Sequence, residues 1–321
     1  MVLHFTGVSN TGKIRKPPAK RAKSPPLLPD QIAFIKELED ETLRNQQAKK
    51  VDKLENISWK VHLEWEQSGI SDITKSIKDI TNSMWIDIPE KGLGANFKAE
   101  IFQYRQSLPP LVTNTQLHGL CYKNPTSVDR ELLSAIESGI IRQLAISRHD
   151  NTGELVIPSE YFFDQIDKLK DQDGQDEATV QMLESYQDLC DDNPANISFR
   201  TDELNEYGIH AAHITFLVKS GFLTLCPGRS GLYNLTIPNL GMYVKLVTTA
   251  RLWVLNTIKK STWKELLESA LTEKMEGSKQ KWRDLRGLKM EWIMKDCHGG
   301  GWCEPFSTPV GRGWKLTGQK F

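Results

Sequence analysis

The residues that could carry phosphoryl-transfer chemistry are scattered in this chain and do not form a kinase signature. Gly92 and Gly94 lack the third glycine of a kinase phosphate loop, and Arg148–Asp150 holds the catalytic-loop residues in a different order. No Asp-Phe-Gly or Ala-Pro-Glu string occurs. Gly7–Lys13 matches most of a Walker A loop, but Ile14 stands where a magnesium-binding hydroxyl is needed. The sequence therefore lacks the expected parts of a protein kinase.

The cysteines and histidines do not have the spacing of a metal or catalytic site. Cys297, His298 and Cys303 lie close together, but a structural zinc ion takes four ligands, usually with a short spacing between cysteines. His210 and His213 fall on one predicted helix without an acidic partner at catalytic spacing. We therefore predict no catalytic residue, no metal and no cofactor. Five scattered cysteines favour a reducing compartment over a disulfide scaffold.

Basic residues with interleaved tryptophans in the C-terminal half are the best candidates for ligand binding. Cations beside duplex phosphates release condensed counterions, so they bind nucleic acid strongly and with a marked salt dependence. The alternative interpretation of these residues is a solvated charged face without a ligand. The nucleic-acid-binding residues predicted from this pattern are Lys245, Arg251, Lys259, Lys260, Lys274, Lys281 and Arg283.

Charge is distributed unevenly, although 41 basic and 41 acidic residues make the whole chain formally neutral. Residues 1–29 carry six cations and no acid, residues 150–206 carry a net charge of −13, and residues 245–321 carry +7. The neutral total therefore does not exclude nucleic acid, because it hides two basic ends and an acidic middle. The first cations predict a nuclear localisation signal or an electrostatic arm, with a solubilising tail as the alternative; they are Lys13, Arg15, Lys16, Lys20, Arg21 and Lys23.

The elements that must position these residues recur as helix, helix, strand, turn and strand. Gly139 and Gly221 each stop a predicted helix just before a strand. Thr126 and Asp129, and likewise Thr262 and Glu265, have the spacing of a capping box, the second opening a helix to about residue 273. This order is typical of a winged helix, a variant of the helix-turn-helix. The similarity between the first two copies predicts a duplicated module.

The predicted fold is α+β and mostly helical, with three tandem winged-helix domains. No stretch approaches 18 consecutive apolar residues, so we expect no membrane partner, and the first ten residues lack the apolar core of a secretory signal. The predicted organisation is a disordered basic tail at 1–29, a helical extension and linker at 30–107 with a long helix to about residue 54, winged helix 1 at 108–170, an acidic loop at 171–197, winged helix 2 with a connecting helix at 198–258, and winged helix 3 at 259–321.

The chain resembles the serine/threonine-protein kinase 19 family over roughly residues 108–316. The similar segments are Leu108–Leu111, Asp129–Leu132, Gly208–Leu225, Pro238–Lys245 and Trp263–Leu267. They occur in the order and spacing of that family, whose name as a kinase is historical and contested. The basic positions that contact nucleic acid in the family fall on Lys245, Lys259 and Lys274. A further family contact falls near residues 124–125, where no arginine stands, and Lys123 or Arg130 would have to substitute.

The resemblance implies tandem winged helices, a nuclear location and binding to double-stranded DNA and RNA. It further implies a non-catalytic adaptor in transcription-coupled nucleotide-excision repair, beside RNA polymerase II and the repair helicase machinery. We expect a monomer or a weak dimer. Two alternatives stay open: a serine/threonine kinase of atypical fold, and a protein–protein scaffold in a transcription complex.

Overall fold

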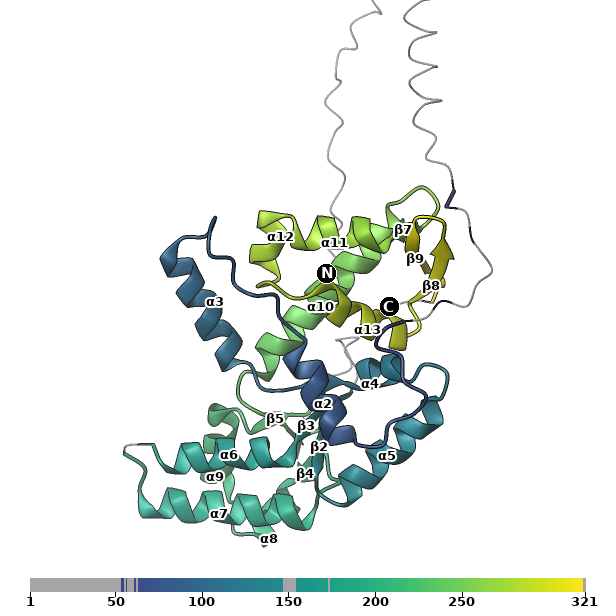
Figure 1. Ribbon diagram of the computed structural model, residues 1–321. Helices are drawn as coiled ribbons and strands as arrows, with labels where there is room; N and C mark the ends of the chain where they lie inside the picture. Colours follow the sequence, from purple (N-terminus) through teal and green to yellow (C-terminus); the bar gives the residue numbers. More distant parts are fainter. Residues whose placement is uncertain are drawn as a thin grey trace, which may run out of the picture. The chain divides into compact units, whose positions relative to one another are not determined.

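The computed structural model describes residues 53–319, apart from residues 55, 57–60, 62, 147–153 and 173. About half of the described residues are helical, and the strands form small antiparallel sheets (Figure 1). None of the helices in these ranges is long and apolar enough to cross a membrane. The predicted tail at 1–29 and nearly all of the predicted helix at 30–54 lie outside the described residues.

Three sheets share one strand order, in which the first strand of each repeat pairs with the third and the third pairs with the second. In the first sheet Val112 lies opposite Val156, and Gln143 lies opposite the same residue from the other side. The strands are β1 (Val112–Thr113), β2 (Ile141–Ala145) and β3 (Glu154–Pro158); β4 (Ser198–Arg200), β5 (Leu223–Leu225) and β6 (Leu232–Leu235); and β7 (Glu265–Leu267), β8 (Cys303–Thr308) and β9 (Gly311–Leu316).

The helices give each sheet a similar setting: at least one helix precedes the first strand, and at least two lie between the first and second strands. The first repeat runs from α2 to β3, the second from α7 to β6, and the third from α10 to β9. The helices are α2 (Ile73–Asn82), α3 (Ala95–Ser107), α4 (Asn114–Leu120), α5 (Pro125–Glu137), α6 (Ser159–Lys170), α7 (Glu177–Asp192), α8 (Thr201–Glu206), α9 (Ala211–Ser220), α10 (Leu240–Lys259), α11 (Glu268–Glu276), α12 (Lys279–Asp284) and α13 (Met290–Gly299).

Local sequence signals explain several helix ends and correct one prediction. Gly221 ends α9 in the left-handed conformation, with φ of 85°, and Gly139 after α5 has φ of 72°. The predicted capping box at Thr126 is wrong, because α5 begins at Pro125, directly after its N-cap Asn124, whose side chain accepts a hydrogen bond from the Ser127 amide. Pro125 occupies the first turn, where its missing N–H costs nothing.

The predicted acidic loop at 171–197 is wrong, because most of it is the helix α7. Its buried residues recur at helical spacing among the acids, and Asp176 caps its first turn by accepting from the Thr179 amide at 3.1 Å. The high acid content concealed this apolar ridge from the composition-based interpretation. The ridge consists of Met182, Leu183, Tyr186, Leu189 and Cys190.

The helix predicted to open at Thr262 is also absent, since the chain enters β7 at Glu265 and begins α11 only at Glu268. The Glu265 carboxylate accepts a hydrogen bond from the Leu54 amide at 2.7 Å, far along the sequence. Leu266 lies opposite Trp314 in the sheet. These long-range contacts outweigh the local capping pattern.

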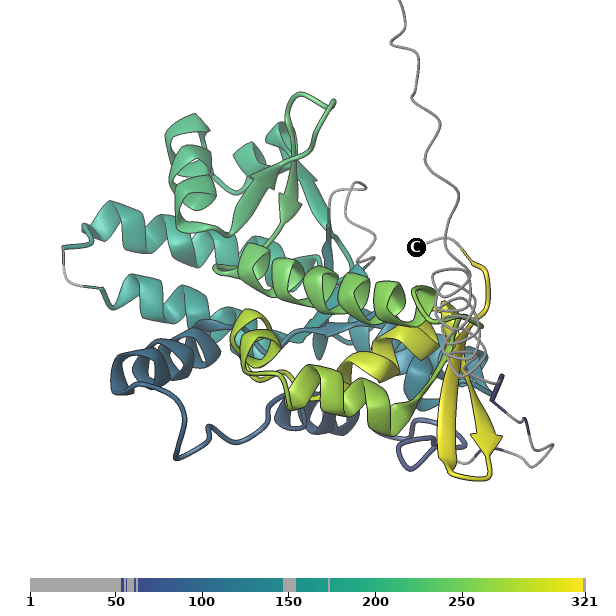
Figure 2. The same ribbon diagram turned by 90° about the horizontal axis from the view of Figure 1, so that it is seen from above.

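The first and third repeats join where α4 crosses α13, with two glycines at the crossing. A Cβ atom on Gly299 would lie 1.7 Å from the Thr115 carbonyl oxygen, and one on Gly119 would lie 2.2 Å from the Lys295 carbonyl oxygen. Only glycine therefore allows the two backbones to approach this closely. Figure 2 shows α10 running between this joined region and the second repeat.

Candidate nucleic-acid interface

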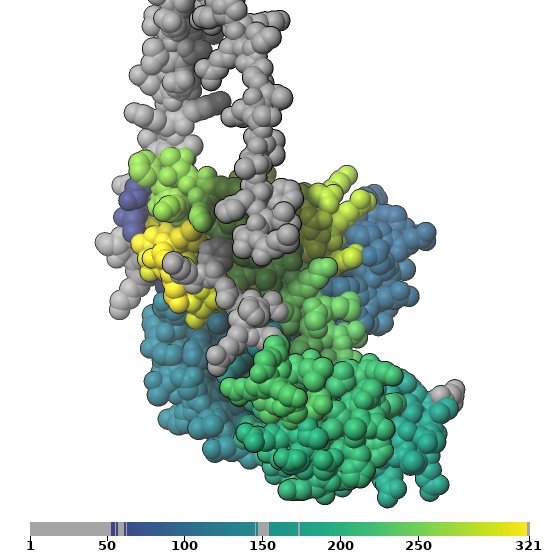
Figure 3. Space-filling model, turned by 180° about the vertical axis from the view of Figure 1, so that it is seen from behind, coloured from purple at the N-terminus to yellow at the C-terminus, as the bar shows by residue number. Residues whose placement is uncertain are grey.

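Helix α10 buries one side and exposes a single stripe on the other, which is polar except for Leu252 at its centre. Positions 245, 249, 252, 256 and 259 are exposed, and this alternation of four and three residues follows one line along a helix. The opposite side is almost wholly apolar, with Tyr243, Val247 and Val254 fully buried. Figure 3 shows α10 from behind, in green, between the second repeat and the rest of the third repeat. Packing of the apolar side therefore fixes the direction in which the stripe points.

Lys245 and Lys259 lie near the two ends of this stripe. Fourteen residues at about 1.5 Å each separate their Cα atoms by about 21 Å along the axis. Successive phosphates along one strand of duplex DNA advance by about 3.4 Å along the helix axis, so the two ammonium groups span about six nucleotide steps. No acidic residue occurs anywhere in α10. The helix therefore offers spaced cations without a neighbouring carboxylate of its own.

The predicted surface cations divide by whether each has an ion-pair or aromatic partner within the described part of the protein. Lys245, Lys259, Lys260 and Lys274 are exposed, and none forms an ion pair with another described residue. Lys274 lies on a different helix, α11, beside the exposed Glu273. The other four surface cations have partners: Lys123 with Glu66 at 2.8 Å, Arg130 with Glu131 at 3.4 Å, Lys281 with Asp284 at 3.1 Å, and Arg283 over the Phe97 ring at 5.1 Å.

Arg251 is a correction to the predicted interface, because it points into the protein. Its side chain is 2% exposed and pairs with the Asp296 carboxylate of α13 at 2.8 Å. The other carboxylate oxygen accepts from Thr113 at 2.7 Å and from Thr115. The guanidinium also lies 4.4 Å from the centre of the Trp302 ring. Arg251 therefore anchors α10 to both the first and third repeats, and it is not available to phosphates.

The helix before each hairpin is where a helix-turn-helix protein usually reads DNA, and none of the three has a basic outer face. In α5 the exposed charges are Asp129, Arg130 and Glu137, and in α9 the single exposed charge is Lys219. In α13 eight of the ten residues are buried. The α10 stripe is thus better suited to phosphates than these helices.

The Cys297–Cys303 region is a packed structural cluster. Within the described ranges no three His, Cys, Asp or Glu side chains are grouped so that they could hold a metal ion. The His298 ring stacks on Tyr122 with centroids 4.0 Å apart, and burial lowers the pKa of His298. A hydrogen bond with Cys303, together with burial, raises the pKa of the Cys297 thiol well above its ordinary value. These groups therefore stay neutral in the folded protein near pH 7.

Sequence reasoning missed one exposed cation and the groove beside α10. Arg229 lies in the turn between β5 and β6, where a cation at a hairpin tip was a usable signal. A groove of about 640 Å³ follows the first turns of α10. No signal in the sequence predicts it, because its walls come from separate parts of the chain. The predicted localisation residues Lys13–Lys23 lie outside the described residues.

The fold and the site together define a mixed α/β protein with repeated small sheets and a cationic helix stripe. The family model described as inactive serine-threonine protein kinase 19 matches residues 81–316, so the chain belongs to this family. This confirms the family predicted from the sequence.

Three curated relatives are similar to this chain. Serine/threonine-protein kinase mug51 of Schizosaccharomyces pombe is 28% identical over 246 residues, which cover 75% of this chain and 77% of the relative. The human protein Winged helix repair factor 1 is 29% identical over 171 residues, covering 52% of this chain and 63% of its own length. The mouse protein of the same name is 28% identical over 171 residues. The match spans less than two thirds of either repair factor.

Proposed function

We propose that each of the three repeats is a winged helix. Support comes from the shared strand order of the sheets and from the helix that precedes each first strand. The name of the human relative, Winged helix repair factor 1, is consistent with this assignment. Because α13 is buried at the joint with the first repeat, the third winged helix acts as part of the framework.

The function that the site supports best is non-catalytic binding of duplex DNA or RNA through phosphates. The observation that carries it is the α10 stripe, where Lys245 and Lys259 are exposed, have no ion pair among the described residues and stand about 21 Å apart. Contacts of this kind are independent of base sequence. The name repair factor, carried by the human and mouse relatives, supports a role in repair. The family resemblance narrows this role to that of a nuclear adaptor in transcription-coupled repair.

The test reverses the charge at Lys245, Lys259 and Lys274 and measures duplex binding over a range of salt concentrations. Each lost phosphate contact is expected to reduce the slope of log affinity against log salt by about 0.9. The triple variant should therefore bind weakly and with a much flatter slope. A control that reverses Lys78, Lys168 and Lys219, which are exposed and outside the predicted interface, changes the net charge equally. Unchanged binding by the first variant, or equal losses in both, would contradict the proposal.

A protein–protein scaffold is the second candidate, and α7 is the observation that favours it. Its exposed stripe of Glu177, Glu184, Asp188 and Asp191 repels phosphates and suits a basic protein segment. A scaffold without nucleic-acid binding would leave the triple variant indistinguishable from the parent protein in low-salt titrations. The two functions are therefore separated by the same experiment.

A nuclear location is proposed from the cations at residues 13–23 and from the family resemblance. Replacing all six with alanine in a fluorescent fusion should abolish nuclear accumulation. The matched control replaces six cations of the second half that lie away from the stripe. Nuclear accumulation of the first fusion would show that this segment does not act as the signal.

A further inference from the structure

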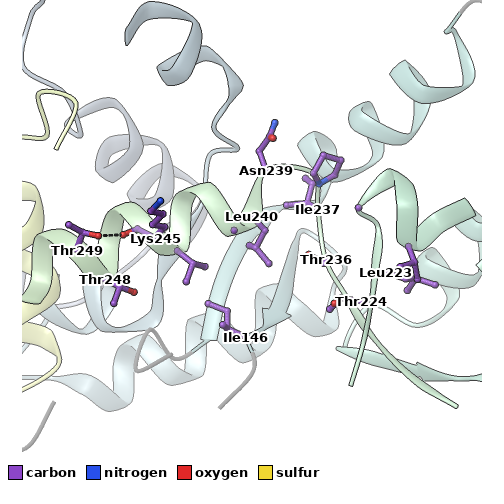
Figure 4. Close-up of a pocket in the computed structure, with 15 residues that line it drawn as sticks. Ile146, Leu223, Thr224, Thr236, Ile237, Asn239, Leu240, Lys245, Thr248 and Thr249 are labelled. Atoms are coloured by element: carbon purple, nitrogen blue, oxygen red, sulfur yellow. Dashed lines mark hydrogen bonds between the residues drawn. The ribbon is translucent and has the colours of Figure 1, made fainter. Parts of the chain in front are cut away.

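A groove of about 640 Å³ runs along the beginning of α10, between the first and second repeats. Figure 4 shows its walls: Ile146 after β2, Thr224 on β5, Ile237 after β6, and Leu240 and Lys245 on α10. The volume lies within the range of pockets that bind ligands, about 300–1,000 Å³. It is open to solvent, so an extended chain could lie along it.

The lining combines an apolar floor, hydroxyl groups and one positive charge. Of the fifteen lining residues seven are apolar, four are threonines, and none is aspartate or glutamate. Lys245 is the one charged residue among them, and it forms no ion pair with another described residue. The groove therefore attracts a ligand that joins an apolar group to a negative charge.

The start of α10 adds to the positive potential that Lys245 creates in the groove. Asn239 is left-handed, with φ of 66°, and its side chain does not cap the helix; its amide donates instead to the Ser107 carbonyl at 3.0 Å. The amides of Leu240 and Met242 already donate to the carbonyls of Ile237 and Asn239, so the positive potential at this first turn comes mainly from the helix dipole. Gly241 in this turn lines the groove and is exposed.

We propose that this groove binds an extended peptide segment of a partner protein that places an apolar side chain next to an aspartate or glutamate. The apolar side chain would lie on Ile146, Ile237 and Leu240, and the carboxylate would face Lys245 and the start of α10. A nucleobase fits less well, because no aromatic residue lines the groove to stack on it. The proposal does not depend on nucleic-acid binding.

The test uses Gly241, which can be enlarged without straining the fold. A Cβ atom there would meet nothing within 4 Å, and the residue has no positive φ. Gly241→Leu therefore projects a side chain into the groove, while Gly241→Ala adds only a methyl group and serves as the matched control. Both changes favour the helix over glycine. Equal or higher melting temperatures will show that the fold is retained.

The probes are peptides selected from a random phage-displayed library on the immobilised full chain, then measured in solution by fluorescence polarisation. We expect the selected peptides to share an apolar residue beside an acid. We expect Gly241→Leu and Lys245→Met to weaken their binding by about tenfold or more, and Gly241→Ala to leave it within about twofold. Selected peptides that lack acids, or that bind Gly241→Leu as well as the parent, would overturn the proposal.

A short DNA duplex measured on the same variants separates this inference from the proposed function. If Gly241→Leu weakens the duplex and no peptide, the groove belongs to the nucleic-acid interface and the peptide proposal fails. If reversal of Lys259 and Lys274 leaves duplex binding unchanged while peptides still depend on Gly241, the proposed function fails and the peptide site stands.

Discussion

Helices α7 and α10 hold the same place in consecutive repeats, each before the first strand of a sheet, yet their outer faces have opposite charge. Exposed positions 177, 181, 184, 188 and 191 of α7 form a stripe of four acids and one glutamine, with the same spacing as the stripe of α10. Helix α7 contains no cation, and α10 contains no acid. One architecture thus presents surfaces that repel and attract phosphates.

The same two helices are each fixed by one buried arginine, but the arginines are satisfied differently. Arg251 of α10 meets a carboxylate, Asp296, at 2.8 Å. Arg142 of β2 is fully buried and donates to the Cys190 carbonyl near the end of α7 at 2.6 Å, over the ring of Phe163. Burial lowers the pKa of Arg142, although Cys190, Tyr186 and Asp191 oppose that shift. The comparison indicates that α10 depends more strongly on the Arg251–Asp296 ion pair than α7 depends on its hydrogen bond from Arg142.

The largest expected loss of stability follows from breaking the ion pair between Arg251 and Asp296. Asp296→Asn keeps the shape of the side chain but leaves the Arg251 charge buried and without a carboxylate. We expect a loss of about 3–5 kcal/mol in the free energy of unfolding, measured by urea denaturation. Arg142→Met removes a buried charge that has no carboxylate in hydrogen-bond contact, so its loss should be smaller. Equal losses in the free energy of unfolding for Asp296→Asn and Arg142→Met would contradict the conclusion that α10 depends more strongly on its buried arginine than α7 does.

The second-largest effect is expected when the charge of the α7 stripe is changed from negative to positive, as in the α10 stripe. Glu184→Lys with Asp188→Lys places two cations on the exposed face, one turn apart. Duplex affinity at low salt should rise, and the salt slope should steepen by up to about two. Glu184→Gln with Asp188→Asn removes the repulsion alone and should steepen the slope little. An unchanged affinity in the lysine variant would mean that this face cannot reach a bound duplex.

Acid sensitivity should be greater at the joint between the first and third repeats than around α7, because His298 is buried at this joint against Tyr122 and Trp314. Burial lowers the pKa of His298 below the ordinary value of 6.5. Below that value the unfolded chain binds a proton that the folded protein resists, so stability is lost as the pH falls from about 6.5 through the folded pKa. The melting temperature should therefore drop as the pH falls below about 6.5, and His298→Gln should flatten this profile. An identical profile in the variant would assign the acid sensitivity to other groups.

The smallest expected effect is the stabilisation that a cation provides at the C-terminal end of a helix. Lys259 lies in the last turn of α10, where a cation interacts favourably with the helix dipole, whereas α7 has no cation in its last turn. Lys259→Gln should lower the free energy of unfolding by about 0.3–1 kcal/mol, and Lys245→Gln should lower it less. Thermal melts at low ionic strength can resolve this difference. A larger loss at Lys245 would indicate a packing role for that side chain.

Most strands and the helices that precede the hairpins were predictable because their signals are local. The glycines at 139 and 221 end helices by the left-handed conformation, which few other residues adopt. Lys245 and Lys259 were predicted as surface cations, and their exposure agrees with that expectation. Their role in binding stays a prediction.

The errors arose where distant contacts or composition overrode local signals. Arg251 has the same charge as its neighbours in the sequence, and its burial follows from Asp296, 45 residues further along. The helix α7 was concealed by its acids, although its ridge repeats at helical spacing. The burial of α13 depends on Gly119, which lies in a separate repeat. Pairings of this kind cannot be inferred from one segment alone.

The glycine crossing of α4 and α13 also determines the order in which the chain can finish folding during synthesis. Gly119 and Gly299 are about 180 residues apart, and translation at about 5–20 residues per second separates their appearance by roughly ten to forty seconds. During that interval the α4 surface that receives α13 is uncovered on the nascent chain. The first repeat therefore acquires its last packing surface only when the third has left the ribosome, and chaperones have that interval in which to bind it.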